Sequence, residues 1–197
     1  MNEAETRAEL IDPKLKACGW GVVEGSKVLR EHPITDGKIQ IGSWSVSGIV
    51  RRGNRDIADY VLMYKGIKLA VIEAKSDELE VGEGVMQAKK YAEKLKLETT
   101  YSTNGKAIYQ ICMKSGEEGL VTDFLSPDEL WNKTYPVATT SADTEEERAR
   151  AELVEAWREK FAAVPFENIN KTKPPRFYQE IAVNAVLEAI INKKDRI

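Results

Sequence analysis

The sequence contains little histidine and little cysteine. Among its 197 residues are one histidine, His32, and two cysteines, Cys18 and Cys112. The cysteines occur in the apolar stretches KACGW and YQICMK without the spacing of metal ligands, so we expect two unpaired thiols that pack as small hydrophobic side chains in a reducing compartment. The sequence shows no Ser-His-Asp or Cys-His set, which leaves covalent hydrolase chemistry without support.

Long apolar runs and a strong net charge are also absent. No stretch of about 18 consecutive apolar residues occurs, and the N-terminal MNEAETRAEL is acidic and polar. The sequence therefore predicts neither a membrane-spanning helix nor a signal peptide, and we expect a cytoplasmic protein. The formal net charge of −3 argues against nucleic-acid binding through bulk positive charge, so any such binding would depend on local basic patches.

The residues that are present predict a folded α/β protein. With 42% hydrophobic and 31% charged residues, the composition is that of a soluble globular chain, long enough for one domain with a tail. Apolar residues recur at spacings of three and four over residues 3–18 and predict a helix that Gly19 ends. The stretch 20–56 is rich in Gly, Ser and Thr and contains β-type runs such as KIQIGSWSVSGIV, which predict one or two strands.

The clearest strand signals are DIADYVLMY and IKLAVIEAK. They are rich in Val, Ile and Tyr and are separated by Lys65 and Gly66, so they predict an antiparallel hairpin. The apolar stripe of VGEGVMQAKKYAEKLKL predicts a helix, and TTYSTNGKAIYQICM predicts two further strands joined at Asn104-Gly105. This order of elements predicts an α/β fold with a mixed central sheet flanked by helices.

The C-terminal third differs in character. A small-residue connector, YPVATTSADT, precedes a predicted helix that begins with Thr144 and Glu147 at the spacing of a capping box. A polar linker, ENINKTKPPRFYQE, leads to a last predicted helix, IAVNAVLEAII. We therefore divide the chain into a first domain (1–135), a helical linker (136–175) and a C-terminal segment (176–197).

Glu73 and Lys75 lie two residues apart at the end of the second hairpin strand, and therefore on one face of it. The register of the hairpin decides which residue they meet. A loop of three or five residues centred on Gly66 places Asp59 opposite Glu73. A two-residue loop at Lys65-Gly66 pairs position 59 with position 72 instead and sends the two carboxylates to opposite faces.

Two adjacent carboxylates need a compensating charge. They repel by about 1 kcal/mol in water and by about 4 kcal/mol at an intermediate dielectric. A hard divalent cation removes this repulsion, because Mg²⁺ prefers carboxylate and carbonyl oxygens and leaves positions open for a phosphate. With Lys75 alongside to hold a water or a phosphoryl charge, Asp59 and Glu73 form a minimal set for phosphodiester hydrolysis.

This set resembles the PD-(D/E)xK nuclease motif, with Ala58 in place of the proline of the name. Gln87 and Tyr91 resemble the Q-x-x-x-Y pair of the RecB-like branch. Together with AETRAELIDPKLKACGW, ADYVLMYKGIKLAVIEAK, QAKKYA and STNG, these residues resemble the N-terminal nuclease domain of the restriction (R) subunit of type I restriction-modification enzymes over about residues 3–115. The resemblance implies a restriction-endonuclease-like fold and an Mg²⁺-dependent DNA endonuclease.

The resemblance also implies which residues form the site. The catalytic residues would be Asp59, Glu73 and Lys75. The metal ligands would be Asp59, Glu73, Ala74 through its carbonyl group, and Glu9. An acid of the first helix often completes such a site, and Glu5, one turn before Glu9, is nearly as good a candidate. Asp56 is the alternative to Asp59.

DNA contacts are expected from the same resemblance and from local basic charge. The residues expected to make them are Gln87, Tyr91, Arg55 and Lys89. Arg55 has two further arginines just before it, and Lys89 has two further lysines on its helix, so both sets could follow a phosphate backbone. Both basic sets are also compatible with an ordinary solvated surface. Gln87 and Tyr91 are also compatible with the polar edge of an amphipathic helix.

The stretch PPRFYQEIAVNAVLEAI resembles the lead-in to a superfamily 2 helicase motor, in which Gln179 would read the adenine of ATP in the full-length protein. No phosphate-binding G-x-G-K-T loop follows, so we interpret residues 176–197 as the truncated start of such a motor. The implied partners are double-stranded DNA and the methylation and specificity subunits of a restriction complex. Two rival interpretations are a free-standing recombination or repair nuclease of the same superfamily and a catalytically inactive DNA-binding or docking module.

Overall fold

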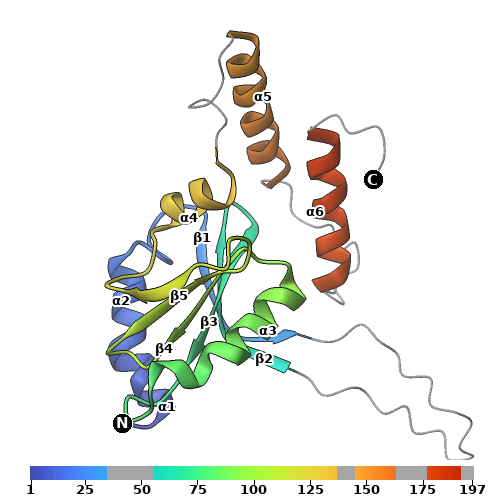
Figure 1. Cartoon of the computed structure of the whole chain (residues 1–197). Helices are drawn as coiled ribbons and strands as arrows, with labels where there is room; N and C mark the ends of the chain where they lie inside the picture. The colour runs from blue at the N-terminus through green and yellow to red at the C-terminus, as the bar shows by residue number, and fades with distance from the viewer. Residues whose placement is uncertain (35–55, 137–144, 163–176, 192–197) are drawn as a thin grey trace, which may run out of the picture.

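The computed structural model describes residues 1–34, 56–136, 145–162 and 177–191 (Figure 1). Within these residues, a six-stranded sheet with the strand order β1-β2-β3-β4-β5-β6 forms the centre of the molecule. Neighbouring strands are antiparallel except β3 and β4, which are parallel. The strands are β1 (Ser26–Ile34), β2 (Asp56–Tyr64), β3 (Ile67–Ala74), β4 (Thr99–Thr103), β5 (Ile108–Cys112) and β6 (Glu118–Val121).

Helices cover both faces of this sheet, so the predicted fold class is confirmed (Figure 1). The predicted N-terminal helix runs through α1 (Glu3–Thr6), a π-helical segment η1 (Arg7–Ile11) and α2 (Asp12–Ala17). A 3₁₀ turn, η2 (Val81–Gly84), leads into α3 (Val85–Leu95). The other described helices are α4 (Pro127–Thr134), α5 (Glu145–Ala162) and α6 (Phe177–Ile191).

Two apolar layers hold the helices to the sheet. On one face, Ile11 and Leu15 of the N-terminal helix belong to the same buried cluster as Ile72 of β3. On the other face, Ala92 of α3 belongs to a cluster with Val71 of β3. Because β3 is central and covered on both faces, its residues are buried from position 69 to position 74, including one glutamate.

The predicted hairpin of β2 and β3 has a two-residue loop, Lys65-Gly66. The φ angles of these residues, 49° and 81°, are those of a type I′ turn, which matches the twist of the strands. Beside the turn, Tyr64 pairs with Ile67. Taken alone, this loop is the alternative that would separate the two carboxylates.

A β-bulge corrects the register one step further along the hairpin. Leu62 pairs with Ala70 rather than with Leu69, so Leu69 is an extra residue on β3. From there the register is shifted by one position, and its continuation places Asp59 opposite Glu73. The expected juxtaposition is thus reached through a turn and a bulge together, and not through a longer loop.

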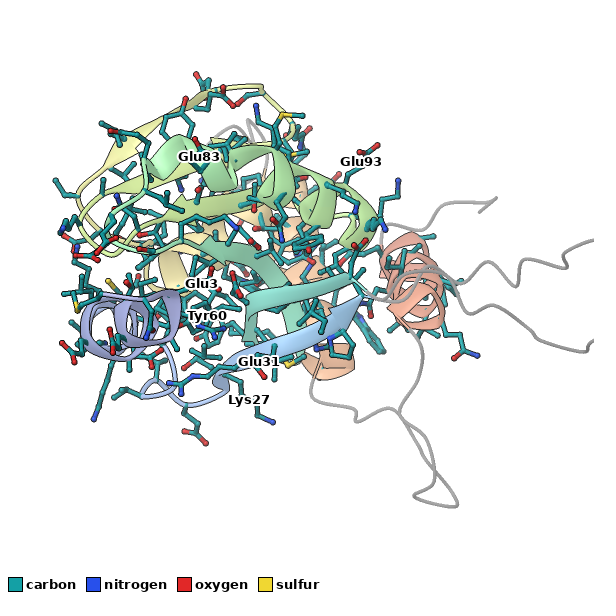
Figure 2. All side chains as sticks on the ribbon, turned by 90° about the horizontal axis from the view of Figure 1, so that it is seen from below. Glu3, Lys27, Glu31, Tyr60, Glu83 and Glu93 are labelled. Carbon is teal, nitrogen blue, oxygen red and sulfur yellow. The ribbon has the colours of Figure 1, made fainter. Side chains whose placement is uncertain are left out.

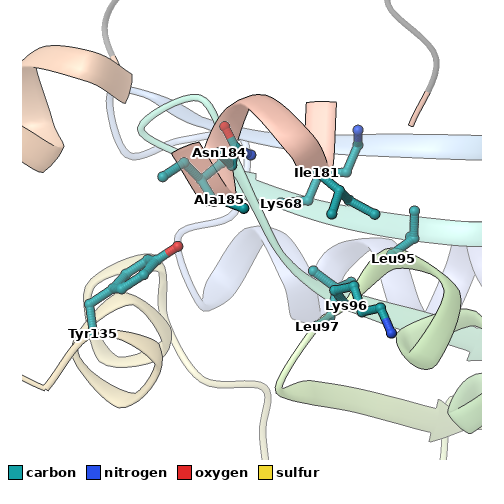
Figure 3. A pocket seen from close by; sticks show the side chains of 9 residues that line it. Lys68, Leu95, Lys96, Leu97, Tyr135, Ile181, Asn184 and Ala185 are labelled. Atoms are coloured by element: carbon teal, nitrogen blue, oxygen red, sulfur yellow. The ribbon is translucent and has the colours of Figure 1, made fainter. Parts of the chain in front are cut away.

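The C-terminal helices α5 and α6 pack against each other and against the turn end of this hairpin (Figure 1). The Nε and Nη2 atoms of Arg158 donate to the two carboxylate oxygens of Glu188 at 2.9 and 3.1 Å, and Lys65 in the turn pairs with Glu159 of α5. A cavity of about 220 Å³ lies between α6, the start of β3 and the end of α3 (Figure 3). These contacts lie at the opposite end of β3 from Glu73.

Two short elements were not predicted, β6 and α4. β6 has four residues, one of them glycine, and α4 has eight residues that begin with a capping box between Ser126 and Glu129. The stretch KIQIGSWSVSGIV and the expected cap Thr144 lie outside the described residues. Cys18 and Cys112 are free thiols, as predicted. No described helix is both long and apolar enough to cross a lipid bilayer.

Candidate active site

The structure brings the predicted catalytic residues together at the end of β3. The Nζ atom of Lys75 donates to Glu73 Oε1 at 2.8 Å. The Oδ2 atom of Asp59, on β2, accepts a hydrogen bond from the backbone N–H of Ala74 at 2.8 Å. The adjacent carboxylates and the ammonium group predicted from the hairpin are therefore present.

Glu73 is a buried acid with an unsatisfied oxygen. Its side chain is part of the core strand at 2% exposure, and its Oε2 atom has no hydrogen-bond partner among the described residues. Burial raises the pKa of Glu73 to about 7, and the charges of Asp59 and Glu3 add to the increase, whereas the hydrogen bond from Lys75 opposes it. Such a group binds either a proton or a cation near neutral pH.

Lys75 stays charged in this arrangement. Burial lowers the pKa of its ammonium group, but the hydrogen bond to Glu73 and the nearby carboxylates outweigh burial and raise the pKa above its usual value. At neutral pH Lys75 is therefore a donor and a positive charge. The geometry favours a role in orienting water or a phosphate over a role as a base.

Gln87 and Tyr91 both belong to the site, but in different roles from the predicted pair of DNA contacts. Lys75 Nζ donates to Gln87 Oε1 at 3.4 Å, and Gln87 Nε2 donates to the hydroxyl of Tyr91 at 2.9 Å. Tyr91 is only 4% exposed, because this part of α3 faces the sheet. The structure therefore corrects the prediction for Tyr91, which lies behind Gln87 and holds it toward Lys75.

Gly84 and Ser102 are site residues that sequence reasoning missed. Ser102 of β4 pairs with Glu73 in the parallel ladder, and its hydroxyl donates to the carbonyl of Val81 at 2.6 Å. A Cβ atom on Gly84 would lie 2.5 Å from Ser102 Oγ and 3.1 Å from Glu73 Cγ. The 3₁₀ turn thus passes directly over Glu73, and the paired glycines in VGEG were the available signal.

The first helix contributes a different acid from the one predicted. Glu9 is exposed, and Glu5 is exposed with its carboxylate in a capping box with Asn2. Glu3 instead is half-buried and contributes to the raised pKa of Glu73 (Figure 2). The physical reason is helical phase: Ile11 faces the core, whereas Glu9, two residues earlier in the π-helical segment, is on the exposed side.

The predicted basic DNA contacts are neutralised or lie outside the described residues. Lys89 pairs with Glu118 on β6. The neighbouring lysines, Lys90 and Lys94, both pair with Asp56, which makes Asp56 an anchor for α3 and not an alternative to Asp59. Outside the described residues lie Arg51, Arg52 and Arg55. Gln179 is exposed on α6.

Arg7 is a further residue that sequence reasoning missed. Its Nη1 atom lies 3.3 Å from Asp59 Oδ1 and its Nη2 atom lies 3.6 Å from Glu31 Oε1. It is the first residue of the π-helical segment, and such segments occur often at functional sites. Asp59 therefore has a guanidinium on one oxygen and a backbone N–H on the other.

The donor set fits a hard divalent cation. Among the described residues no group of three or more acidic, histidine or cysteine side chains is gathered into a metal centre. Mg²⁺ does not need one, because it is commonly held by one or two carboxylates and several waters. The unpartnered Oε2 of Glu73 is suited to this, and the Ala74 carbonyl points to the same side of β3 as the Ala74 N–H that Asp59 binds.

The raised pKa of Glu73 predicts a specific pH dependence of stability. The carboxyl group titrates at 4.5 in the unfolded chain and at about 7 in the folded protein, so between these values the folded state holds a proton that the unfolded state has lost. The resulting stabilisation is fully present below pH 4.5 and is lost as pH rises through 7. At about 1.4 kcal/mol per pKa unit, metal-free protein loses up to about 3 kcal/mol of unfolding free energy relative to Glu73→Gln.

Urea denaturation of both proteins at a series of pH values in a metal chelator measures this difference. Two pH profiles that run parallel between pH 4 and pH 8 would show that Glu73 titrates at its ordinary value.

Comparison with known proteins gives three matches. A family model described as the second domain of the type I restriction enzyme EcoKI endonuclease subunit matches residues 30–127. A curated relative, the type I restriction enzyme EcoAI endonuclease subunit of Escherichia coli, is 28% identical over 209 residues, covering 100% of this chain and 23% of that protein. A solved fragment assigned to an HsdR subunit of a type I restriction enzyme from Vibrio vulnificus YJ016 has a TM-score of 0.73 and 32% identity.

The structural match extends over 100% of this chain and 34% of the solved chain, so this chain spans roughly a quarter to a third of the length of these relatives. The matched fold is the mixed sheet flanked by helices, and the family model extends over the strands that carry Asp59 and Glu73. By these matches and by its fold, this chain is similar to part of the endonuclease subunits of type I restriction enzymes.

Proposed function

We propose that this chain is the nuclease domain of a type I restriction enzyme subunit and that it hydrolyses phosphodiester bonds of DNA with Mg²⁺. One observation supports this most strongly. A buried glutamate with an unpartnered oxygen lies beside a second carboxylate and a charged lysine, at the end of a rigid central strand. A purely structural strand end gains nothing from this arrangement, because a buried unsatisfied carboxylate oxygen destabilises the fold. An inactive docking module would have no use for it.

The chain's residues divide the work of the reaction. Asp59, Glu73 and the carbonyl of Ala74 would hold Mg²⁺, which when bound lowers the pKa of an attacking water and stabilises the charge on the phosphoryl group. Lys75 donates from the same edge of the site toward the attacked phosphate or the water. Gln87 orients Lys75, since it accepts from its ammonium group at 3.4 Å.

The resemblance of the sequence to the restriction subunit gives the wider context of the proposal. In the full-length protein, a motor beyond this chain would translocate double-stranded DNA with ATP, with Gln179 in its adenine-reading segment. The nuclease domain would correspond to residues 1–135, the helical linker to 136–175 and the start of the motor to 176–197. Methylation and specificity subunits would select foreign DNA in the cytoplasm. The paired lysines of α3 support this division of labour, because their ion pairs leave this helix little free positive charge for tight DNA binding.

Two measurements on the wild-type protein test the proposal. Thermal unfolding of this chain at pH 8 is expected to shift upward with Mg²⁺ in a saturable way, since a ligand at 100 times its Kd stabilises by about 2.7 kcal/mol. Circular DNA is expected to be cut by the full-length subunit assembled with its partners when Mg²⁺ and ATP are present. The proposal would be contradicted if Mg²⁺ did not change the unfolding temperature of this chain and the assembled complex hydrolysed ATP without cutting the circular DNA.

A further inference from the structure

Arg7 bridges the candidate active site and an adjoining cavity. Its guanidinium contacts Asp59 Oδ1 through Nη1 and Glu31 Oε1 through Nη2. The other oxygen of Asp59 is taken by the backbone N–H of Ala74. Arg7 therefore binds the oxygen of Asp59 that does not accept from Ala74, and does so from a side chain that is 22% exposed.

A divalent cation changes the charge balance around Arg7. Asp59 and ionised Glu73 contribute two negative charges, Lys75 and Arg7 contribute two positive charges, and Glu31 and Glu3 lie nearby as further acids. A divalent cation at Asp59 and Glu73 adds two positive charges within a few ångströms of the guanidinium, where repulsion is strong in a partly buried setting. Asp59 is then a poorer partner for Arg7, which keeps the exposed carboxylate of Glu31 and can take a further anion.

The adjoining cavity provides a place for that anion. It has a volume of about 340 Å³ and borders Arg7. Ala4 and Ala8, on either side of Arg7 in the helix, leave the space open because their side chains are small, and Arg30 of β1 lines the cavity as a second guanidinium. Arg30 is 62% exposed and is held by Asp12 at 2.7 Å. Asp12 and Glu31 also line the cavity, so it combines two acids with two guanidinium forks, which match the oxygens of a phosphodiester.

The backbone at Glu31 is strained where it supports this arrangement. Glu31 has φ 49°, a left-handed conformation that costs free energy in a residue other than glycine. The ladder of β1 and β2 pairs the residues on either side of it, and its continuation places Glu31 opposite Asp59. Figure 2 labels Glu31 near Tyr60, which also lines the cavity. The strained residue directs a carboxylate to the second nitrogen of Arg7, so Arg7 already contacts both the active site and the cavity wall.

We propose that Arg7 takes the place of a divalent cation beside Asp59 in the metal-free protein and, once the cation binds, turns into the adjoining cavity to bind a DNA backbone phosphate with Arg30. This inference rests on the nuclease function proposed above and adds to it an order of events. Binding of the cation releases Arg7, so Arg7 binds a DNA phosphate only when the metal needed for cleavage is in place.

Calorimetric titration of Mn²⁺ into the chain without DNA tests the first half. In Arg7→Gln a competing charge is gone, so Mn²⁺ affinity is expected to rise about tenfold, which corresponds to about 1.4 kcal/mol. Arg30→Gln leaves it unchanged, because Arg30 pairs with Asp12. Lys16→Gln, which removes an exposed charge from α2 in the same N-terminal helix, also leaves it unchanged and serves as the matched control.

Binding of a 20-base-pair duplex in Ca²⁺ or in chelator, at several salt concentrations, tests the second half. In Ca²⁺, Arg7→Gln and Arg30→Gln each reduce the slope of log affinity against log salt by about 0.9, the value for one lost phosphate contact. In chelator, Arg7→Gln leaves the slope unchanged. Lys16→Gln matches the wild type in both conditions.

The outcomes separate this inference from the proposed function. A wild-type chain that binds no divalent cation overturns both. A wild-type chain that binds Mn²⁺, together with an Arg7→Gln variant that binds it equally or more weakly, overturns only the role of Arg7 and makes the contact with Asp59 purely structural. If Arg7→Gln does not fold, Glu31→Gln replaces it, since this exposed residue draws Arg7 away from Asp59. Glu31→Gln is then expected to weaken Mn²⁺ binding, and unchanged binding overturns the inference.

Discussion

Replacing Asp59 by asparagine is expected to reduce DNA cutting about 100-fold to 1000-fold while the domain stays folded. Asparagine keeps an oxygen that can accept the backbone N–H of Ala74, now bonded at 2.8 Å, so the contact between β2 and β3 survives. It lacks the negative charge that would hold Mg²⁺ with Glu73. The measurement is cleavage of circular DNA by the full-length subunit in its complex, with ATP hydrolysis measured in the same reaction.

Asp56→Asn is the matched control, three residues earlier on the same strand. Asp56 pairs with Lys90 and Lys94 of α3, and a hydrogen bond from Lys94 lowers its pKa, so it is a structural anchor. We expect this variant to lose about 1 kcal/mol of stability and to cut at the wild-type rate. Retained cutting in Asp59→Asn, or equal loss of cutting in the two variants, would contradict the assignment. Loss of cutting and ATP hydrolysis together would indicate misfolding.

Replacing Gly84 by alanine is expected to reduce cutting at least about tenfold and to cost about 1 to 3 kcal/mol of stability. The added Cβ would lie 2.5 Å from Ser102 Oγ and 3.1 Å from Glu73 Cγ, both in the buried sheet. The backbone itself is not strained, since Gly84 has φ −87°. The whole effect therefore comes from displacement of Glu73 and Ser102. The cleavage rate measures the loss of cutting, and urea denaturation measures the loss of stability.

Gly82→Ala provides the control for Gly84→Ala within the same 3₁₀ turn. A Cβ atom on Gly82 would meet nothing within 4 Å, so cutting and stability are expected to stay at wild-type values. Ser102→Ala combined with Gly84→Ala removes the nearest clashing atom and should recover part of both losses. If Gly84→Ala cuts normally, the turn over Glu73 does not set the position of that carboxylate.

The main elements of the fold could be predicted because their signals are local. The β2–β3 hairpin is specified by two runs of β-branched and aromatic residues around Lys65-Gly66, and α3 by a continuous apolar stripe. β6 and α4 were missed because they are short and owe their stability to the elements beside them. For α4 the capping box at Ser126 and Glu129 was a usable signal, but eight residues are too few for a clear apolar period.

The active site was predictable only in part. The residue types Asp59, Glu73 and Lys75 indicated the chemistry, yet their meeting depended on a register that the sequence left open between two alternatives. Arg7 is far from Asp59 in the chain and Gly84 belongs to the element after β3, so only tertiary packing shows that they touch Asp59 and Glu73. Glu9, the acid expected from the first helix, is exposed, whereas Glu3 lies close enough to contribute to the raised pKa of Glu73.

The extra residue at Leu69 has a consequence for how this site is inherited. Asp59 and Glu73 face each other only because β3 has one residue more than β2 between the turn and these two positions. A deletion anywhere between Gly66 and Glu73 would keep every functional side chain and yet rotate the Glu-Ala-Lys triplet toward the helices on the far face. Conversely, a relative with one more residue in its turn and a regular ladder would arrive at the same geometry. The number of residues in this hairpin therefore decides whether the catalytic side chains meet, and the identities of those residues alone do not.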